Sequence, residues 1–384
     1  MIPRNARLIL EEMARTFPVV AVTGPRQSGK TTLCRKAFDH LPYASLEDPD
    51  VLEHAMFDPR GFLERNADGV VLDEVQRCPE LFSYLQGFVD QDPRPGRFIL
   101  TGSQQFGLMA SITQSLAGRV ALLSLLPFSV GELRGASLLP SSLDELIVKG
   151  SYPPIYDRGP IPSIWYASYV QTYVERDVRQ LINVRDLIQF QRFLRLCAGR
   201  TGQLLNFSAL GDEAGVSHNT AREWISVLEA SYVVHRLPPH FRNFNKRLVK
   251  TPKLYFYDCG LAAWLLGIES PDHLETHPLR GALFETWVVS EFLKRRFNQG
   301  QPSNLSFWRN QSGLEVDIVE DQAGVLFPIE VKSGATVTRD SLKGLLTWTA
   351  MAATEAGQAR LVSGSKSGGM KHGIEIIPWH ELFG

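Results

Sequence analysis

A glycine-rich segment near the N-terminus has the residue types and the spacing that bind phosphate groups. It fits the pattern G-x-x-x-x-G-K-[ST], directly after an apolar run at 19–23 and before a helical pattern. Glycines let backbone N–H groups surround phosphate oxygens at a helix N-terminus, Lys30 neutralises phosphate charge, and the Thr31 hydroxyl coordinates Mg²⁺. We predict an ATP site, whose cofactor-binding residues are Gly24, Pro25, Arg26, Gln27, Ser28, Gly29, Lys30, Thr31 and Thr32.

A second apolar run, at 70–72, ends in two carboxylates. Asp73 is expected to hold Mg²⁺ through water, and Glu74 to polarise the water that attacks the γ-phosphate, so the pattern favours hydrolysis over simple nucleotide retention. The alternatives are a glycine-rich turn with an accidental lysine and an acidic strand end that faces solvent. Either alternative leaves one of the two paired motifs unexplained.

Polar residues further along the chain are candidates for contacts with the γ-phosphate. A predicted buried strand at 99–101 is followed by hydroxyl groups, of which we favour Ser103 as the phosphate sensor, with Thr101 second. Arg119 ends a helical segment and could reach a phosphate of its own subunit or, as an arginine finger, of a neighbouring subunit. A surface arginine that caps a helix is an equal alternative. A homo-oligomer is predicted only on the arginine-finger hypothesis.

Another group of charged residues lies towards the C-terminus, on a helix and two strand patterns. The period of two in a strand puts Glu330 and Lys332 on one face, and Asp317 lies on the preceding strand. Glu285 lies on a helical stretch among bulky apolar residues, where burial is costly without a cation. Two carboxylates and a lysine can therefore converge, with Glu285 upstream of them in the sequence.

The elements that must position these residues follow from hydrophobic periodicity. Short apolar runs alternate with amphipathic segments at 19–22, 70–72, 98–100 and 121–123. This alternation predicts a parallel sheet covered on both faces, an α/β fold of the P-loop NTPase type. A mostly helical region follows, and a helix at 282–296 with later strands indicates an α+β C-terminal region. We predict three domains, at 1–135, 136–275 and 276–384.

The middle region contains a helix, a tight turn and a second helix at 207–230, followed by two strand patterns. This order indicates a winged helix-turn-helix, with Ser208 and Ser217 as helix N-caps. A segment at 241–250 interleaves cations with aromatic residues, as a wing that contacts nucleic acid would. The second helix exposes few cations, so DNA contact and packing against another protein fit the pattern equally well.

Composition and charge limit the other function classes. The chain has 384 residues, of which 44% are hydrophobic and 21% charged, as in an ordinary globular protein. Its formal net charge of -1 gives no global field towards nucleic acid or an anionic membrane, so any DNA contact requires a local basic patch. The four cysteines form no C-x-x-C pair, which argues against a zinc site or a disulfide framework. We expect a cytoplasmic protein without membrane contact, because no signal core or membrane-spanning run is apparent.

Taken together, the motif at 24–31, the carboxylates Asp73 and Glu74, and the sequence around Ser103 and Arg119 resemble a family of AAA-type P-loop ATPases. These bacterial and archaeal proteins carry an uncharacterised C-terminal domain. The resemblance covers nearly the whole chain. It implies an ATPase domain, a middle winged-helix region and a nuclease-like C-terminal domain.

The order of Glu285, Asp317 and then Glu330-Val331-Lys332 is similar to that of the restriction-endonuclease-like, or PD-(D/E)XK, nucleases. In these enzymes the carboxylates bind Mg²⁺, which activates water, and the lysine orients the nucleophile or neutralises charge. The resemblance therefore implies a second Mg²⁺ site in this chain, with Asp317 and Glu330 as metal ligands and with Glu285, Asp317, Glu330 and Lys332 as catalytic residues. Val316 stands where the family has its leading proline. The alternatives are a solvated hairpin with surface charges and a nuclease-like fold kept for binding.

Two hypotheses on function follow. The leading one is an ATPase whose nucleotide turnover controls a C-terminal region that binds and cleaves DNA. The rival is a nucleotide-dependent regulatory switch that binds a protein partner and has an inactive nuclease-like fold.

Overall fold

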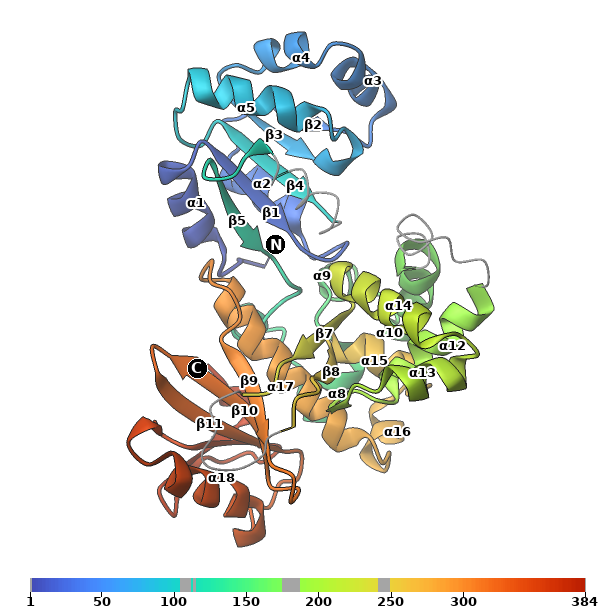
Figure 1. The fold of residues 1–384 in the computed structure, drawn as a ribbon, viewed down its shortest axis with the longest axis vertical. Coiled ribbons are helices and arrows are strands. Elements are labelled where there is room, and N and C mark those ends of the chain that lie inside the picture. The colour runs from blue at the N-terminus through green and yellow to red at the C-terminus, as the bar shows by residue number, and fades with distance from the viewer. Residues whose placement is uncertain (1, 104–111, 113–114, 175–186, 241–248, 384) are drawn as a thin grey trace. The chain divides into compact units, whose positions relative to one another are not determined.

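The computed structural model describes residues 2–103, 112, 115–174, 187–240 and 249–383. The chain forms two compact units (Figure 1). The first contains Met1–Phe128, Ala230–Tyr232 and Lys294–Pro302, and the second contains Ser129–Glu229, Val233–Leu293 and Ser303–Gly384. Most of the predicted middle and C-terminal domains thus falls in one unit, and the three-domain division itself stays a prediction.

A five-stranded sheet forms the centre of the first unit, in the order β2-β3-β4-β1-β5. All neighbouring strands run parallel, which confirms the prediction from the apolar runs. The strands are β1 (Val19–Thr23), β2 (Tyr43–Ser45), β3 (Val70–Asp73), β4 (Phe98–Gly102) and β5 (Val120–Ser124). Because parallel strands end at the same edge of a sheet, the segments that follow β1, β3 and β4 meet there.

Helices cover both faces of this sheet, because successive strand residues point to opposite faces. They are α1 (Arg7–Thr16), α2 (Lys30–Ala37), α3 (Pro49–Phe57), α4 (Pro59–Arg65), the 3-10 helix η1 (Val75–Arg77) and α5 (Leu81–Gln91). Val19 and Ala21 of β1 pack in a core with residues of α3, α4 and α5. Val20 and Val22 pack in a second core with residues of α1 and α2.

The first part of the second unit is mostly helical, in agreement with the prediction. It contains α7 (Val130–Gly135), α8 (Leu143–Lys149), α9 (Pro153–Asp157), α10 (Pro162–Tyr169), the π-helix η2 (Val170–Val174) and α12 (Leu187–Ala198). A three-stranded sheet follows in the order β6-β8-β7, with bounds β6 (Gln203–Leu204), β7 (Val234–Leu237) and β8 (Lys253–Phe256). The remaining helices are α13 (Phe207–Ala214), α14 (His218–Ala230), α15 (Cys259–Leu265) and α16 (Pro271–Glu275).

Local sequence explains the turn between α13 and α14. Asn206 caps α13 by accepting a backbone N–H at 3.0 Å, so the prediction of Ser208 was wrong: Ser208 already lies inside the first turn. Gly215 ends α13 at a φ of 78°, a left-handed conformation that glycine adopts without strain. Ser217 accepts a backbone N–H at 3.1 Å in the first turn of α14, which confirms its predicted capping role.

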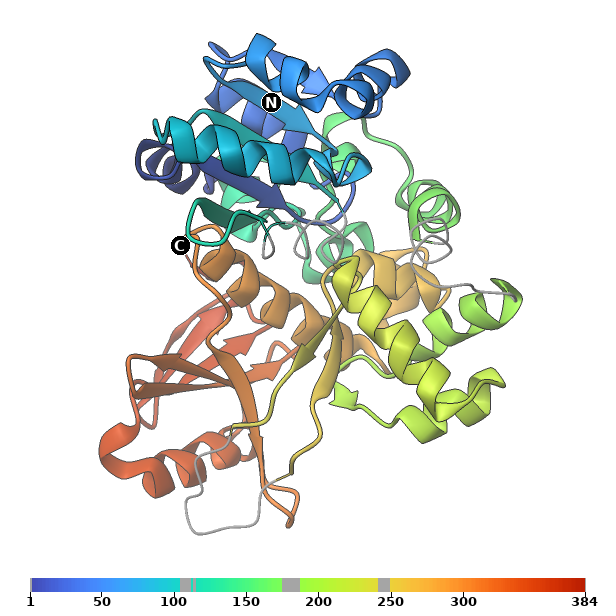
Figure 2. The ribbon, with the colours of Figure 1, turned by 45° about the horizontal axis from the view of Figure 1, so that its top comes forward.

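A six-stranded sheet forms the C-terminal part of the second unit, in the order β13-β14-β12-β11-β10-β9. The strands are β9 (Leu305–Arg309), β10 (Glu315–Gln322), β11 (Val325–Lys332), β12 (Arg360–Ser363), β13 (Gly369–Lys371) and β14 (Ile374–Pro378). The helix α17 (Arg280–Phe297) precedes the sheet, and α18 (Arg339–Ala352) packs on β10 and β11 (Figure 2). The antiparallel ladder between β10 and β11 runs to Ile318↔Ile329, next to Asp317 and Glu330.

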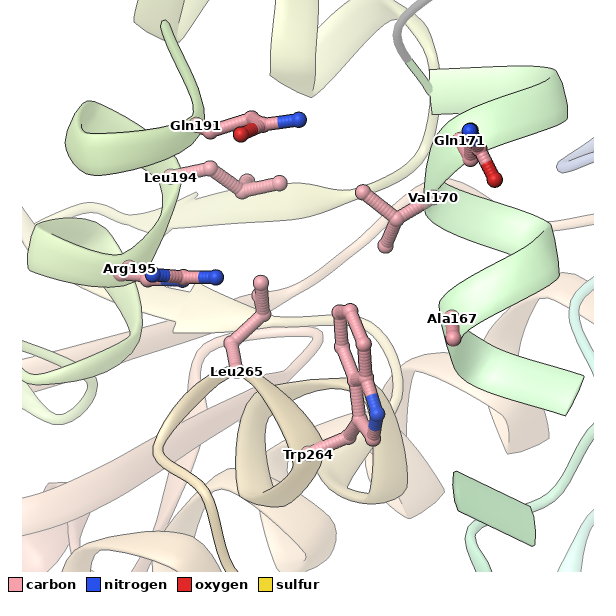
Figure 3. Close-up of a pocket in the computed structure, with 8 residues that line it drawn as sticks. All are labelled: Ala167, Val170, Gln171, Gln191, Leu194, Arg195, Trp264 and Leu265. Carbon is pink, nitrogen blue, oxygen red and sulfur yellow. The ribbon is translucent and has the colours of Figure 1, made fainter. Parts of the chain in front are cut away.

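A cavity of about 200 Å³ lies among the helices of the second unit (Figure 3). Trp264 and Leu265 of α15 border it, together with residues of α10, η2 and α12. Its lining residues are Ala167, Val170, Gln171, Gln191, Leu194, Arg195, Trp264 and Leu265. The residues predicted to carry chemistry lie elsewhere.

Two further observations concern the predicted partners. Residues 241–248 of the predicted basic wing lie outside the described residues. In the part of the chain that the structure describes, no helix combines the length and the apolar character needed to cross a membrane.

Candidate nucleotide site and carboxylate cluster

The predicted phosphate-binding segment forms a turn between β1 and the N-terminus of α2. Gly24 has a φ of 144° and Gly29 a φ of 93°, conformations that favour glycine. A Cβ atom on Gly24 would lie 2.1 Å from the carbonyl oxygen of Leu125, so this close approach requires glycine. Gln27 also has a positive φ, of 61°, while Arg26 is half-buried. The loop thus holds the compact shape that a phosphate cradle needs.

Lys30, the first residue of α2, is buried against this loop. Its ammonium group donates to the carbonyl oxygens of Gly24 at 3.0 Å and Pro25 at 2.8 Å. Burial lowers the pKa of Lys30 to about 8, and two nearby carboxylates oppose that shift. The buried Ser28 hydroxyl has no hydrogen-bond partner among the described residues. A cation and an unpaired hydroxyl at a helix N-terminus fit the phosphate oxygens of a nucleotide.

Asp73 ends β3 beside the phosphate-binding loop. Its carboxylate accepts hydrogen bonds from the hydroxyl groups of Thr31, at 3.0 and 3.1 Å, of Tyr43, at 2.8 Å, and of Thr101. The two residues predicted to hold Mg²⁺, Thr31 and Asp73, therefore lie together, whereas Thr32 is exposed on α2. A hydroxyl and a carboxylate supply the oxygen ligands that Mg²⁺ prefers, so the pair fits this ion.

Glu74 follows Asp73 in a left-handed backbone conformation with a φ of 54°. This conformation costs a non-glycine residue about 1–2 kcal/mol, and such strain is typical of functional sites. The Glu74 Oε2 accepts from the Ser103 hydroxyl at 3.0 Å and from the Gln76 side-chain amide at 2.5 Å. The favoured sensor thus contacts the predicted water-polarising residue, and the second candidate, Thr101, contacts Asp73.

Arg119 lies just before β5 and forms a two-point ion pair with Asp90 of α5. Its Nε is 2.5 Å from Oδ1 and its Nη2 is 3.0 Å from Oδ2 of Asp90. The guanidinium is therefore engaged on a helix of the same unit rather than by the residues around Lys30. Contact of Arg119 with a phosphate, of its own subunit or of a neighbour, stays a prediction.

Two residues that are distant from the motifs in the sequence form hydrogen bonds at the phosphate-binding loop and at the residue before it. Sequence analysis missed both. The Nη1 of Arg4 donates to the carbonyl oxygen of Ser28 at 2.6 Å. The Tyr232 hydroxyl lies 2.8 Å from the hydroxyl of Thr23, the residue before Gly24. No local pattern marks either residue, because these contacts join positions 24 and 209 residues apart in the sequence.

The second unit brings Glu285 of α17, Asp317 of β10 and Glu330 of β11 into one carboxylate cluster. Burial raises the pKa of Glu285 and of Glu330 well above the usual range, and the charge of Asp317 raises both further. Lys253 opposes the shift at Glu285, and Lys332 opposes it at Glu330. Repulsion between buried carboxylates of this kind favours a bound cation.

Glu330 and Lys332 interact directly, since the Lys332 Nζ donates to Glu330 Oε1 at 2.6 Å. The other carboxylate oxygen of Glu330 is buried and has no hydrogen-bond partner among the described residues. Asp317 Oδ2 accepts from the Val331 backbone N–H at 2.9 Å, where the ladder between the two strands ends. The cluster therefore combines a lysine with one unpaired carboxylate oxygen.

Two residues of β8 complete the cluster, and sequence analysis missed both. The Lys253 side chain is 3% exposed, and its Nζ lies 2.9 Å from Glu285 Oε1 and also pairs with Glu315. The Tyr255 hydroxyl donates to the same oxygen of Glu285. The sequence does contain a signal for Lys253, which is a lysine at the start of an otherwise apolar strand. A lysine buried at such a position requires a charged partner.

The residues of this cluster fit a small divalent ion through two ligands. Within the described ranges, no group of three or more His, Cys, Asp or Glu side chains is placed to hold a metal ion. Mg²⁺ commonly takes one or two carboxylates and completes its shell with water or phosphate oxygens. Asp317 and Glu330 meet this requirement, since Glu330 keeps an unpaired buried oxygen.

Family models match three consecutive segments of the chain. An AAA domain matches residues 16–134, and a domain of unknown function, DUF4143, matches residues 280–382. A further domain of unknown function, DUF8612, matches residues 140–272 between them. The chain therefore carries an AAA domain followed by a C-terminal DUF4143 domain.

Two solved structures illustrate the limited similarity of the chain to proteins of known structure. The Walker-type ATPase of Pyrococcus abyssi is 15% identical and gives a TM-score of 0.45, over 68% of this chain and 94% of that chain. AMPPCP-bound DnaA from Aquifex aeolicus is 14% identical and gives a TM-score of 0.32, over 58% of this chain and 85% of that chain.

Two mycobacterial proteins are similar to most of the chain. They are the uncharacterized proteins Rv2008c of Mycobacterium tuberculosis and Mb2031c of Mycobacterium bovis. Each is 32% identical over 336 residues, which cover 87% of this chain and 74% of the relative. The chain therefore belongs to the family of these two proteins, as an AAA-type protein with a C-terminal DUF4143 domain.

Proposed function

We propose that the first unit binds ATP with Mg²⁺ and hydrolyses it. The observation that supports this most is the convergence of Lys30, Thr31, Asp73 and Glu74 at one edge of the parallel sheet. Lys30 and the N-terminus of α2 bind the phosphates, and Thr31 with Asp73 holds the metal ion. The ion, when bound, neutralises charge on the β- and γ-phosphates.

In this proposal Glu74 orients and polarises the water that attacks the γ-phosphate. Its carboxylate is held by Ser103 at 3.0 Å and by Gln76 at 2.5 Å, which fixes the side chain at the end of β3. Ser103 thereby positions the carboxylate on which hydrolysis depends. Positioning of this kind is the main contribution that a protein makes to phosphoryl transfer.

A comparison of ATP binding with ATP hydrolysis tests this proposal. Lys30→Ala should abolish binding, because it removes the cation of the loop. Glu74→Gln keeps the side-chain shape, so it should bind ATP but slow hydrolysis about 100-fold or more. The control is Glu80→Gln, at an exposed carboxylate just before α5, which should match wild type. Hydrolysis that survives both Lys30→Ala and Glu74→Gln would contradict the assignment.

We further propose that the second unit acts on DNA through a winged helix and a metal-dependent nuclease-like site. The order β6, α13, α14, β7, β8 supports the winged helix, because it matches the succession of elements in that fold. The carboxylate cluster supports the second part. In this proposal Asp317 and Glu330 hold Mg²⁺, which activates water, and Lys332 neutralises the charge of the phosphate under attack.

Incubation of DNA with the purified chain and Mg²⁺ or Mn²⁺ tests the nuclease-like site. Asp317→Ala and Lys332→Ala should each abolish cleavage, because one removes a metal ligand and the other the phosphate-neutralising cation. The control is Lys343→Ala, at an exposed lysine of α18. If wild type cleaves neither single- nor double-stranded DNA with either ion, the site is not a nuclease for DNA.

A regulatory switch that binds a protein partner is the rival proposal, and the charge distribution favours it. The formal net charge of the chain is -1, so no global field attracts nucleic acid. Arg222, a cation of α14, lies over the Phe207 ring at 5.5 Å. Nucleic-acid affinity that depends on phosphate contacts should fall steeply with salt. Absence of DNA binding even at low salt would select the protein-partner switch.

A further inference from the structure

The buried ammonium of Lys253 lies between two partly buried carboxylates, those of Glu285 and Glu315. We infer that Lys253 takes the place of a second metal ion beside Glu285 and Glu315, so that the cluster binds a single divalent ion at Asp317 and Glu330. This inference rests on the proposed metal-dependent function of the second unit. It adds a lysine of β8 to that site and states how many ions the site takes.

The contacts of Lys253 are those of an internal cation. Its side chain is 3% exposed, and its ammonium lies 2.9 Å from Glu285 Oε1 and pairs with Glu315. The rings of Phe307 and Tyr255 lie 5.5 and 6.0 Å from the ammonium, within cation–π range. A compact ammonium charge surrounded by carboxylates and ring faces supplies the neutralisation that a divalent ion would otherwise supply.

Both carboxylates beside Lys253 are also engaged by other groups. Tyr255 donates to Glu285, and the Nη1 of Arg309 lies 3.3 Å from Glu315 Oε2. A metal ion at this place would have to displace the ammonium and at least one of these partners. Such displacement is unfavourable, because it would leave a buried lysine without its counter-ions.

Asp317 and Glu330 remain for the metal. Glu330 is 8% exposed, and its Oε2 has no hydrogen-bond partner among the described residues. A buried oxygen of this kind points to a ligand that completes it. Two carboxylates suffice for one Mg²⁺, whereas two-metal sites place two ions about 3.5–4 Å apart and need more carboxylate oxygens.

The number of bound Mn²⁺ ions, measured by electron paramagnetic resonance on the full chain without nucleotide, tests this inference. Asp73→Asn is present in every sample, so that the nucleotide site does not contribute. In this background we expect one ion. Glu285→Gln should keep one ion, because Glu285 is held by Lys253, and Asp317→Asn should lose it.

Lys253 variants provide the direct comparison. Lys253→Met should raise the count from one ion to two, because it frees Glu285 and Glu315 for a metal, whereas Lys253→Arg keeps the cation and should stay at one. Lys343→Met, at the exposed lysine of α18, controls for loss of a positive charge. Thermal unfolding shows whether Lys253→Met folds, and if it does not, the Glu285→Gln and Asp317→Asn counts decide.

The outcomes separate this inference from the proposed function. Two ions in the background chain, or loss of the ion in Glu285→Gln, overturns the inference and leaves a metal-dependent site in place. An unchanged count of one in a folded Lys253→Met also overturns it. If the background chain binds no Mn²⁺ at all, the proposed metal-dependent function fails, and the inference fails with it.

Discussion

At the scale of single residues, the requirement for glycine at position 24 can be tested by its effects on stability and on nucleotide binding. A Cβ atom there would lie 2.1 Å from the Leu125 carbonyl oxygen, and the φ of 144° disfavours any other residue. Gly24→Ala should therefore reduce the free energy of unfolding by about 2 kcal/mol or more and abolish ATP binding. Denaturant unfolding and nucleotide titration measure the two effects.

Gly87→Ala is the matched control for this prediction. Gly87 lies inside α5, and a Cβ atom there would meet nothing within 4 Å. Alanine should be neutral or should stabilise the helix by about 0.5–1 kcal/mol. Equal stability of the two variants would contradict the constraint at Gly24.

The role of some site residues could be predicted from the sequence, and the role of others could not. Lys30, Thr31 and Asp73 belong to short motifs whose spacing already encodes their local geometry, and the structure brings them together. Arg4 and Lys253 act on residues far away in the sequence, so that only the folded chain shows their partners. Motif spacing reports local backbone shape, whereas these contacts depend on tertiary packing.

At the scale of elements, we predict that His235 of β7 makes the stability of the second unit depend on pH. Its Nε2 is buried without a partner among the described residues, and burial, with the charge of Arg236, lowers the pKa of His235 to about 4. The unfolded chain binds the proton near pH 6.5, so stability is full above that pH and falls as the pH drops towards 4. We expect a contribution of roughly 1–2 kcal/mol between pH 7 and pH 5.

Denaturant unfolding of His235→Phe at pH 7 and pH 5 measures this contribution. Phenylalanine keeps a ring beside Tyr257, whose centroid lies 5.6 Å from that of His235, but it cannot take up a proton. The variant should lose less stability than wild type on acidification. If both lose the same amount, His235 does not carry the effect.

Elements with a continuous apolar run could be predicted, and short or mixed elements could not. The runs at β1, β3, β4 and β5 predicted four of the strands in the first sheet. β2 has three residues and none fully buried, so it leaves no apolar signature. α18 was not predicted, although its buried residues Leu342, Leu345 and Trp348 repeat at helical spacing.

At the scale of the whole molecule, most of the DUF4143 region forms one compact unit with most of the region before it and makes polar contacts with that region. Arg280 binds Asp144 at 2.7 Å, the Thr201 and Thr286 hydroxyls are 2.7 Å apart, and Lys253 holds Glu285. A fragment of residues 276–384 would leave Glu285 and Arg280 without these partners. Removal of one partner of a buried charge such as Lys253 costs about 3–5 kcal/mol.

Circular dichroism during urea unfolding tests this dependence. The 276–384 fragment should show no cooperative transition, whereas a fragment of residues 129–384 should unfold cooperatively. A cooperative transition in the short fragment would show that this region folds independently, as the predicted boundary at 275 implies.

The central claim is that the AAA domain hydrolyses ATP and couples turnover to the rest of the chain. Mg²⁺-dependent ATP hydrolysis by the full chain, with and without DNA and beside Glu74→Gln, tests it most directly. We predict hydrolysis that DNA stimulates and that falls about 100-fold or more in Glu74→Gln. Turnover that DNA does not change would favour the protein-partner switch, and equal rates in wild type and Glu74→Gln would contradict the account.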